Sequence, residues 1–369
     1  MEKSSILIMP ALFAGGAEKQ YRYIIETANK EKSNLVVFLV NKPLKGMESE
    51  TERFIRCNAN VEFHQLDNNV LNFNAESKNK VRIEKVKALL VLYAQLRKYI
   101  KKNNVDTVMF SYVTQLMLTP FFNKNGVNVV FNERNTGRQI CDSKMKRSLL
   151  KKCHKVIANS NYAARYVQDK TGINVEVVKN GLVTDRIEKV GHTDFVILVP
   201  ARLTPIKNQL VVLRALKIIG TNGLKVIFAG SVKDEAYYAK LKEYVVENDL
   251  EKCVSFPGHV SNMKDMYATT DLMILPSFEE GTPNVLLESY LYEIYPLVSD
   301  IPMNRDCCIS ESLLFSPDDA DKLAEKIQEV MKMSANQKEE IASKGFQYVC
   351  DEYSMEKLAQ NYKRILFDA

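Results

Sequence analysis

The sequence lacks the residue patterns of several protein classes. It has seven cysteines, an odd number without C-x-x-C spacing, so we expect reduced thiols rather than a disulfide scaffold or a zinc site. Only four histidines are present, without the spacing of metal ligands. No run of about 18 apolar residues occurs, so no transmembrane helix is expected. Residues 1–13 fit a strand better than a signal peptide, and we expect a cytoplasmic chain.

The charge of the chain is divided unevenly between its halves. Residues 1–184 hold 30 Lys and Arg against 16 Asp and Glu, a net charge of +14. The remainder holds 21 basic and 29 acidic residues, a net charge of −8. Such a division indicates that the first half faces an anionic partner.

Short apolar runs rich in β-branched residues alternate with segments of helical period. Repeated βα units predict parallel sheets covered by helices on both faces, and two series of them predict two doubly wound α/β domains. The chain of 369 residues is also long enough for two domains. The expected strands lie at 5–9, 34–40, 61–65, 106–110, 128–131, 155–159 and 175–178, then at 194–200, 224–230, 253–256, 271–276, 296–300 and 313–315.

The domain boundary is expected in the polar segment that follows the turn signal Asn180-Gly181. This gives an N-terminal domain at 1–184 and a C-terminal domain at 185–352. Residues 353–369 read as a helix with Leu358, Tyr362 and the pair Ile365-Leu366 on one face. Because this helix follows the second series, we expect it to cross back to the first domain.

The stretch "EEGTPNVLLES" at 279–289 follows a predicted buried strand. Thr282 is expected as the N-cap of a helix and Pro283 as its first residue. The first turn would then present N–H groups to an anion at the carboxyl end of the sheet. Glu280 and Glu288 are placed to accept hydrogen bonds from sugar hydroxyls. An ordinary capped helix with solvated carboxylates remains an alternative interpretation.

Two cations follow the strand at 194–200. Arg202 and Lys207 lie in the loop at the carboxyl end of that strand and at the start of the next helix. An arginine and a lysine there suit a diphosphate, although two surface cations would look the same. A third segment, with Gly15 and Gly16 after the first strand, lets a ligand approach the backbone or simply makes a turn. Neither G-x-G-x-x-G nor a P-loop pattern is present.

These segments together resemble the retaining glycosyltransferases of family 4, which have the GT-B architecture of two Rossmann-like domains facing a central cleft. The resemblance covers nearly the whole chain. Its most specific part is the E-x7-E pair, Glu280 and Glu288, combined with Arg202 and Lys207 five residues apart. The supporting segments are "GGAEKQ", "VIANSNYAARYV", "VKNGLVTDRI", "VPARLTPIKNQ", "VIFAGS", "VSFPGHV", "DLMILPSFEEGTPNVLLES" and the C-terminal helix.

The resemblance implies a role for each matching residue. Arg202 and Lys207 match the pair that neutralises the donor diphosphate, and Glu280 matches the glutamate that hydrogen-bonds the donor sugar; these three form the implied catalytic set. Glu288 matches the glutamate that holds the ribose hydroxyls. The other donor-binding positions lie in three segments. Gly16 matches a loop facing the phosphates, and Gly258, His259 and Val260 match a loop framing the nucleobase. The loop and helix start that hold sugar and phosphate are Gly281, Thr282, Pro283, Asn284, Val285 and Leu286.

Several positions depart from the family pattern. The stretch after Glu288 lacks the usual Gly-x-Pro, Ser231 stands where a second glycine is usual, and Asn208 replaces a common glycine. The loop that often carries a histidine near the donor sugar reads "VVFNERNTG", so Glu133 and Arg134 stand there as acceptor-side candidates. Gly15, in the loop after the first strand, is the third candidate. These departures concern the identity of the sugar more than the type of reaction.

The implied reaction is transfer of a hexose or N-acetylhexosamine, expected from a UDP sugar, with retention of configuration. No metal or other cofactor is implied, because cations and a helix dipole stabilise the leaving phosphate. The implied acceptor is a glycan on polyprenyl diphosphate, used in bacterial O-antigen or capsule assembly. A non-catalytic GT-B partner of another transferase and a sugar-nucleotide epimerase are the alternatives.

Two basic segments of the first half stand out. Residues 79–102 place apolar side chains at helical spacing between basic ends, and residues 144–155 add six cations. The apolar set is Val86, Leu89, Leu90, Tyr93, Leu96 and Ile100. The segment at 79–102 fits a core helix with a solvated basic rim, or a contact with an anionic membrane. We expect peripheral binding at the inner face of the plasma membrane. Nucleic acid fits less well, because aromatic residues are not interleaved with the cations.

Overall fold

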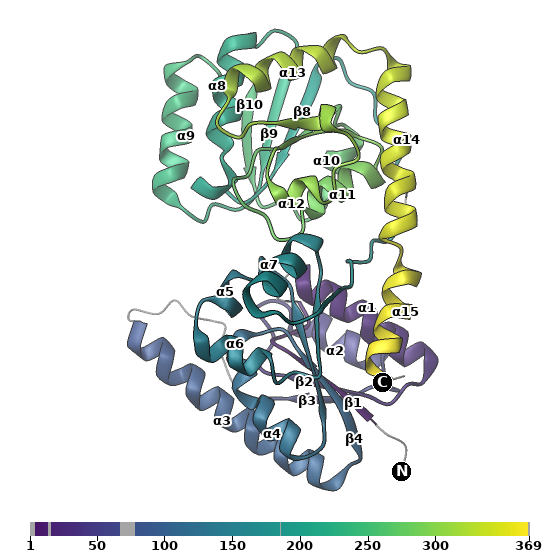
Figure 1. The fold of residues 1–369 in the computed structure, drawn as a ribbon. Coiled ribbons are helices and arrows are strands. Elements are labelled where there is room, and N and C mark those ends of the chain that lie inside the picture. The colour runs from purple at the N-terminus through teal and green to yellow at the C-terminus, as the bar shows by residue number, and fades with distance from the viewer. Residues whose placement is uncertain (1–3, 14–15, 67–77, 185, 368–369) are drawn as a thin grey trace. The chain divides into compact units, whose positions relative to one another are not determined.

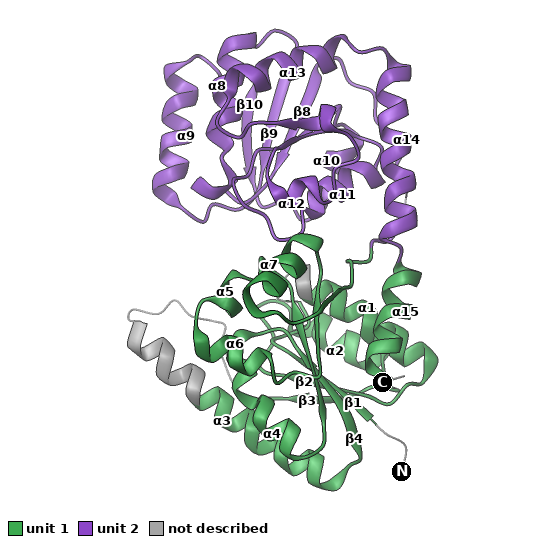
Figure 2. Cartoon of the chain, in the orientation of Figure 1, with its two compact units in different colours: residues 1–181, 355–369 green, residues 182–354 purple. Residues whose placement is uncertain are grey.

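The computed structural model describes residues 4–13, 16–66, 78–184 and 186–367, with only the backbone described at 16–17 and 78–86. It divides into two compact units, Met1–Gly181 with Met355–Ala369, and Leu182–Ser354 (Figures 1 and 2). The sequence prediction ended the N-terminal domain at residue 184 and the C-terminal domain at residue 352. Each unit is described below by itself.

Unit 1 is built on a seven-stranded sheet whose paired strands are all parallel, in the order β3-β2-β1-β4-β5-β6-β7. Every strand expected in the first half is present. The strands are β1 (Ser4–Met9), β2 (Leu35–Leu39), β3 (Glu62–Gln65), β4 (Val105–Phe110), β5 (Asn128–Glu133), β6 (Lys155–Ala158) and β7 (Val175–Val177).

Successive residues of β1 enter different cores on the two faces of this sheet, because side chains alternate along a strand. Ile6 and Ile8 pack under one layer of helices, and Leu7 and Met9 pack under the other. The first layer holds α3 (Lys78–Lys102), η1 (Val113–Leu118), α4 (Thr119–Lys124), α5 (Arg138–Cys141), α6 (Lys144–Leu150) and α7 (Asn161–Thr171). The second holds α1 (Gly16–Glu31), α2 (Glu48–Cys57) and α15 (Met355–Leu366).

The last helix, α15, completes the second of these cores. Leu358, Tyr362, Ile365 and Leu366 are all buried there, as their spacing predicted. The amide of Asn132 in β5 donates to the Tyr362 hydroxyl at 2.7 Å. The C-terminal segment is therefore an integral part of unit 1.

The expected inner face of α3 is partly wrong. Leu96 is buried and Leu89, Tyr93 and Ile100 pack against the core, but the Leu90 side chain is 61% exposed. Ala88 and Leu92 are buried instead, because 88, 92 and 96 follow the i, i+4 row of a helix. Val86, like the cations Lys80, Arg82 and Lys85, lies outside the residues whose side chains are described.

Unit 2 is built on a six-stranded sheet with the order β10-β9-β8-β11-β12-β13, again with parallel pairing throughout. Every strand expected in the second half is present, which confirms the α/β class. The strands are β8 (Phe195–Pro200), β9 (Leu224–Ala229), β10 (Val254–Gly258), β11 (Leu272–Leu275), β12 (Tyr295–Ser299) and β13 (Leu314–Phe315).

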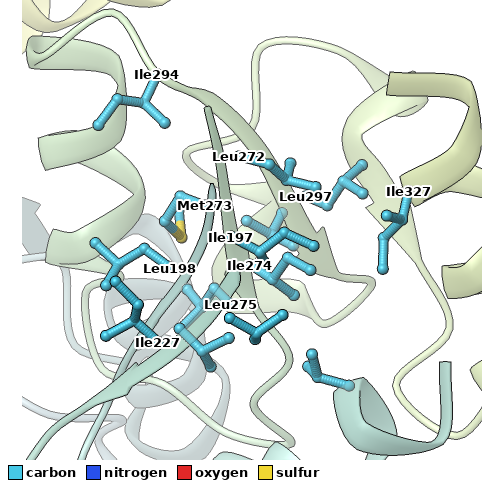
Figure 3. Packing of buried hydrophobic residues seen from close by; sticks show 14 of the residues in the cluster. Ile197, Leu198, Ile227, Leu272, Met273, Ile274, Leu275, Ile294, Leu297 and Ile327 are labelled. Carbon is cyan, nitrogen blue, oxygen red and sulfur yellow. The ribbon is translucent and has the colours of Figure 1, made fainter. Parts of the chain in front are cut away.

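Apolar side chains of the central strands fill the core of unit 2, among them Ile197, Leu198, Met273 and Ile274 (Figure 3). Strands buried on both faces read as continuous apolar runs, which is why "FVILVP" and "DLMILP" were recognisable. The helical elements are η2 (Pro205–Lys207), α8 (Gln209–Ile219), α9 (Glu235–Glu247), α10 (Met263–Ala268), α11 (Asn284–Leu291), α12 (Pro302–Arg305), η3 (Glu311–Leu313), α13 (Ala320–Lys332) and α14 (Ala335–Glu352).

The strand order places a topological switch point beside β8. The chain moves from β8 to β9 and β10 on one side, then returns to β11 on the other side. Ligands of doubly wound folds bind outside the carboxyl ends of the strands at this point. The segment that follows β8 carries Arg202 and Lys207, and the loop and helix that follow β11 carry Glu280 and Glu288.

Candidate active site

The loop after β8 is shaped by Asn208. This residue adopts a left-handed conformation with φ of +53°, which favours glycine and, among other residues, asparagine. Its side-chain amide donates to the carbonyls of Pro276, at 3.2 Å, and Pro317, at 2.7 Å. Asparagine thus keeps the backbone conformation that a glycine would allow and also ties the β8 loop to the end of β11.

This tie brings Lys207 and Glu280 together. The backbone N–H of Phe278 donates to the carbonyl of Ile206 at 2.9 Å, and this bond holds the loop after β11 against the loop after β8. Lys207 Nζ then lies 2.7 Å from Glu280 Oε1, and the two side chains are only 16% and 11% exposed. A lysine has three donors, so Lys207 can keep Glu280 and still bind a phosphate oxygen. Arg202, on the same loop, is exposed.

The helix after β11 begins one residue later than the sequence predicted. The N-cap is Pro283, without a side-chain cap bond, and α11 starts at Asn284. The Asn284 N–H donates to the Thr282 carbonyl at 2.8 Å, so the chain turns before it becomes helical. The Leu286 N–H donates to the Pro283 carbonyl at 3.0 Å. The positive end of α11 still follows directly on the loop with Glu280 and Gly281.

Glu288, in the middle of α11, is held by a tyrosine of another helix. The hydroxyl of Tyr267, at the end of α10, donates to Glu288 Oε2 at 2.7 Å. The Tyr267 ring is 1% exposed and lies 5.0 Å, centroid to centroid, from the Tyr292 ring. Burial, and then the Glu288 carboxylate, raise the pKa of the Tyr267 hydroxyl well above its usual value. Tyr267 therefore acts as a permanent hydrogen-bond donor to the Glu288 carboxylate.

The loops after β9 and β10 meet the Arg202 loop at Gly230. An added Cβ at Gly230 would lie 2.0 Å from the Ala201 carbonyl oxygen and 2.9 Å from the Arg202 nitrogen. The Gly230 N–H donates to the Gly258 carbonyl at 2.8 Å. Beyond Gly258, which has φ of +76°, His259 is exposed and Val260 is half-buried. Gly230 therefore sets the backbone positions of the loops after β8 and β10 at once.

The segment that leaves the family pattern after Glu288 packs against α14. Tyr290 is fully buried, and an added Cβ at Gly345 would lie 2.4 Å from its ring. The Tyr290 hydroxyl accepts the N–H of Ile309 at 3.3 Å. A large residue on α11 is thus matched by a glycine on α14, which explains how the altered segment fits.

In unit 1, the acceptor-side candidates Glu133 and Arg134 lie at the carboxyl end of β5. Gly15 falls outside the described residues, and Gly16 is the first residue of α1. Glu133 is buried at the end of β5, and its carboxylate accepts the Asn135 N–H at 2.7 Å. Desolvation raises the pKa of Glu133, while N–H groups of its own loop act in the opposite direction. These contacts indicate that Glu133 shapes its loop.

Arg134 is engaged inside unit 1 as well. One guanidinium nitrogen donates to the Asn180 side chain at 2.8 Å, and the group lies 5.8 Å from the Tyr21 ring centroid. Asn180 immediately precedes the last residue of the unit's first segment. Arg134 therefore connects the β5 loop to the segment that leaves unit 1.

The described part of the chain contains neither a cluster of side chains suited to a metal ion nor a membrane-spanning helix. No group of three or more His, Cys, Asp or Glu side chains there is arranged to hold a metal ion. No helix among the same residues combines the length and the apolar character needed to cross a bilayer.

Comparison with protein families identifies the family of this chain. Residues 14–186 match the sequence model described as Glycosyltransferase Family 4, and residues 184–348 match the one described as Glycosyl transferases group 1. The chain belongs to glycosyltransferase family 4. Both matches include segments named above, the Gly16 segment in the first and the Arg202, Lys207 and E-x7-E segments in the second.

One curated relative comes from Campylobacter jejuni and is 26% identical over 178 residues. It is the GalNAc-alpha-(1->4)-GalNAc-alpha-(1->3)-diNAcBac-PP-undecaprenol alpha-1,4-N-acetyl-D-galactosaminyltransferase. The alignment covers 46% of this chain and 47% of the relative, so the chain spans about half of that protein's length.

Solved structures show the same two-domain GT-B fold. A glycosyltransferase from Rickettsia africae has a TM-score of 0.78 at 18% identity, with both chains covered completely. The Anabaena protein HepE, in complex with UDP and glucose, has a TM-score of 0.75 at 16% identity over 99% of each chain. At these identities the likeness establishes the fold alone.

Two residues that shape this family 4 site were not predicted from the sequence. Tyr267 lies 21 positions before Glu288 in an ordinary amphipathic helix, and only the folded chain brings the two together. Near Gly230, the sequence pattern indicated only a departure at Ser231, the next residue, where a second glycine is usual. It did not predict the close contact of Gly230 with Ala201. A single glycine after a buried strand was the available signal.

Proposed function

We propose that this chain is a retaining glycosyltransferase that moves a sugar from a nucleoside diphosphate to a glycan hydroxyl. The observation that carries the proposal is the Lys207–Glu280 ion pair, 2.7 Å long, beside the start of α11 at the switch point of unit 2. These three groups at one sheet edge complement a sugar diphosphate. The cation and the helix N-terminus suit the diphosphate, and the carboxylate suits the sugar hydroxyls.

The charges of the reaction assign the roles. Breaking the sugar–phosphate bond leaves negative charge on the departing diphosphate, and Lys207, Arg202 and the start of α11 stabilise it. Glu280 accepts hydrogen bonds from the donor sugar, and Glu288 accepts them from the ribose. Attack occurs on the face that the diphosphate leaves, and the departing phosphate takes the proton of the acceptor hydroxyl. We propose no metal for this step.

The donor is proposed to be a UDP-hexose or UDP-N-acetylhexosamine, with support from the HepE complex with UDP and glucose. The acceptor is proposed to be a polyprenyl-diphosphate-linked glycan of bacterial surface polysaccharide assembly. Support for it comes from the undecaprenol-linked glycan in the name of the Campylobacter relative. Unit 1, with the positive half of the chain, is proposed to bind this acceptor.

A screen of nucleotide sugars by thermal shift tests the donor assignment. A donor at one hundred times its Kd should stabilise the folded chain by about 2.7 kcal/mol, because it binds only the native state. Transfer or slow hydrolysis of the same donor distinguishes an active enzyme from a silent partner of another transferase. An epimer of the donor as the sole product would favour an epimerase. No stabilisation by any UDP or GDP sugar would contradict the proposal.

We also propose that unit 1 binds the anionic inner face of the plasma membrane. Exposed cations support this: Lys144 lies in α6, and Lys151 and Lys152 follow it directly. Each basic residue near anionic lipid adds about 1 kcal/mol to the free energy of membrane binding. Met145 of the same helix and Met117 of η1, which packs against it, are 60% and 56% exposed. The chain should float with anionic liposomes at low salt and not with neutral ones. Equal recovery with both would contradict the proposal.

The Tyr267–Glu288 bond should matter for nucleotide affinity. Replacing Tyr267 with phenylalanine removes one hydrogen bond worth about 1 kcal/mol, so the Kd for UDP should rise about fivefold. Titration calorimetry with UDP and with 2′,3′-dideoxy-UDP measures the effect. The rise should vanish for the dideoxy nucleotide, because Glu288 then has no ribose hydroxyl to bind. Tyr244→Phe, on α9 of the same unit, is the matched control. An equal rise with both nucleotides would assign Tyr267 a purely structural role.

A further inference from the structure

Unit 1 contains a cavity of about 260 Å³ that the proposed reaction does not use. It lies at the carboxyl edge of the sheet, between the residues that follow β1, β2 and β4 and one side of α3. Leu89 and Leu92 of α3 line it, together with Val40 after β2 and Val113 at the start of η1. The wall is therefore largely aliphatic.

Two of the polar side chains of the lining, those of Tyr112 and Gln115, are already engaged. The Tyr112 hydroxyl donates to the buried carboxylate of Glu18 at 3.0 Å. Gln115 accepts the Tyr112 N–H through its side-chain oxygen at 3.2 Å. A sugar needs partners for several hydroxyls, and unpaired polar groups are costly when buried. No charged side chain lines the cavity among the described residues, so it does not suit a phosphate either.

Three exposed cations adjoin residues of the cavity wall in the sequence. Lys42, Lys87 and Arg138 each neighbour a lining residue in the chain, namely Asn41, Ala88 and Gln139, and all three cations are exposed. The acidic side chain nearest the lining through a contact described above is Glu18, which is buried and bound to Tyr112. An apolar cavity with a basic rim complements an amphiphile whose apolar chain ends in an anionic group.

We propose that this cavity binds the first isoprene units of a polyprenyl diphosphate, with the diphosphate held at the basic rim. This inference rests on the proposed function, because it takes the lipid-linked acceptor as the ligand and names where its lipid end is held. The cavity is smaller than the roughly 300–1,000 Å³ pockets that enclose whole small ligands, so it takes only a segment of the chain. It shares the carboxyl edge of the sheet with the β5 loop, where the acceptor glycan is proposed to bind.

Titration calorimetry with geranyl diphosphate, a two-isoprene analogue, tests the proposal on the full chain. Geranyl diphosphate should bind at least tenfold more tightly than inorganic diphosphate, because only it buries apolar surface. Leu89→Trp fills the cavity and should weaken its binding at least tenfold. Leu90→Trp is the matched control: it lies one position on in α3, is 61% exposed, and should change the Kd less than twofold. Lys42→Ala should weaken binding severalfold and reduce its dependence on salt.

The outcomes separate this inference from the proposed function. Equal affinity for geranyl and inorganic diphosphate, or equal loss in Leu89→Trp and Leu90→Trp, would overturn the cavity assignment while donor binding and transfer stand. If geranyl diphosphate binds and the variants change its affinity as expected, but no nucleotide sugar binds, the cavity assignment would stand and the transferase proposal would be rejected. Val113→Phe repeats the filling test from η1, and the melting temperature of each variant shows whether it is folded.

Discussion

Replacing Lys207 with alanine is expected to lower kcat/KM for sugar transfer by about 100- to 1,000-fold, the usual cost of removing one group that stabilises a developing negative charge. Two effects act in the same direction. The departing diphosphate loses a cation, and Glu280, whose side chain is only 11% exposed, loses its ion-pair partner. Steady-state kinetics with the donor found in the screen measures the change.

The fold should survive this substitution, because Lys207 lies in a loop and contributes no apolar core. Lys217→Ala is the matched control, since Lys217 is an exposed lysine of the neighbouring helix α8 and should leave kinetics unchanged. Arg202→Ala should reduce transfer as Lys207→Ala does. Wild-type turnover in both the Arg202 and the Lys207 variant would remove the diphosphate assignment altogether.

Replacing Gly230 with alanine is expected to destabilise unit 2 by about 3 kcal/mol and to reduce transfer as well. The added methyl group would lie 2.0 Å from the carbonyl oxygen of Ala201, and backbone cannot rotate away as a side chain can. The loop that carries Arg202 must therefore shift or the strand end must unfold. Urea denaturation followed by circular dichroism measures the stability, and kinetics measures the displacement of Arg202.

Gly191 provides the control for this experiment. It belongs to the same unit, and an added Cβ there meets nothing within 4 Å. Gly191→Ala should leave both the denaturation midpoint and the transfer rate within error of the wild type. A Gly230→Ala variant as stable and active as Gly191→Ala would show that the contact between the β8 and β9 loops is not needed.

The strands and the sheet class were predictable from the sequence because burial on both faces leaves a local signature. Runs such as residues 195–200 and 272–276 are apolar without interruption and end at a proline, and both form central strands of unit 2. The positions of Arg202 and Lys207 after the first run, and of Glu280 after the second, then follow from the parallel order of strands. The site was therefore recognisable as a meeting of two loops.

What the sequence could not supply depends on contacts between distant residues. No sequence pattern around Asn208 predicts its hydrogen bonds to the carbonyls of Pro276 and Pro317, and none around Tyr267 predicts its bond to Glu288. The start of α11 was misplaced because Thr282 and Pro283 are favourable at the N-cap and first helical positions, yet a turn at the Thr282 carbonyl takes the Asn284 N–H. Leu90 was misassigned because several apolar residues of α3 fit more than one helical face.

The route of the chain through its two units has a consequence for protein synthesis. Leu182 leaves unit 1 and Met355 re-enters it, and Leu182 donates its N–H to Tyr353 beside this re-entry at 2.8 Å. On the ribosome, the core between β1 and α15 cannot close until α15 (Met355–Leu366) has emerged. Unit 2, one continuous segment, can fold earlier, although domains usually fold from the N-terminal end first. A nascent chain arrested before residue 355 should therefore hold a folded second unit and an open first one.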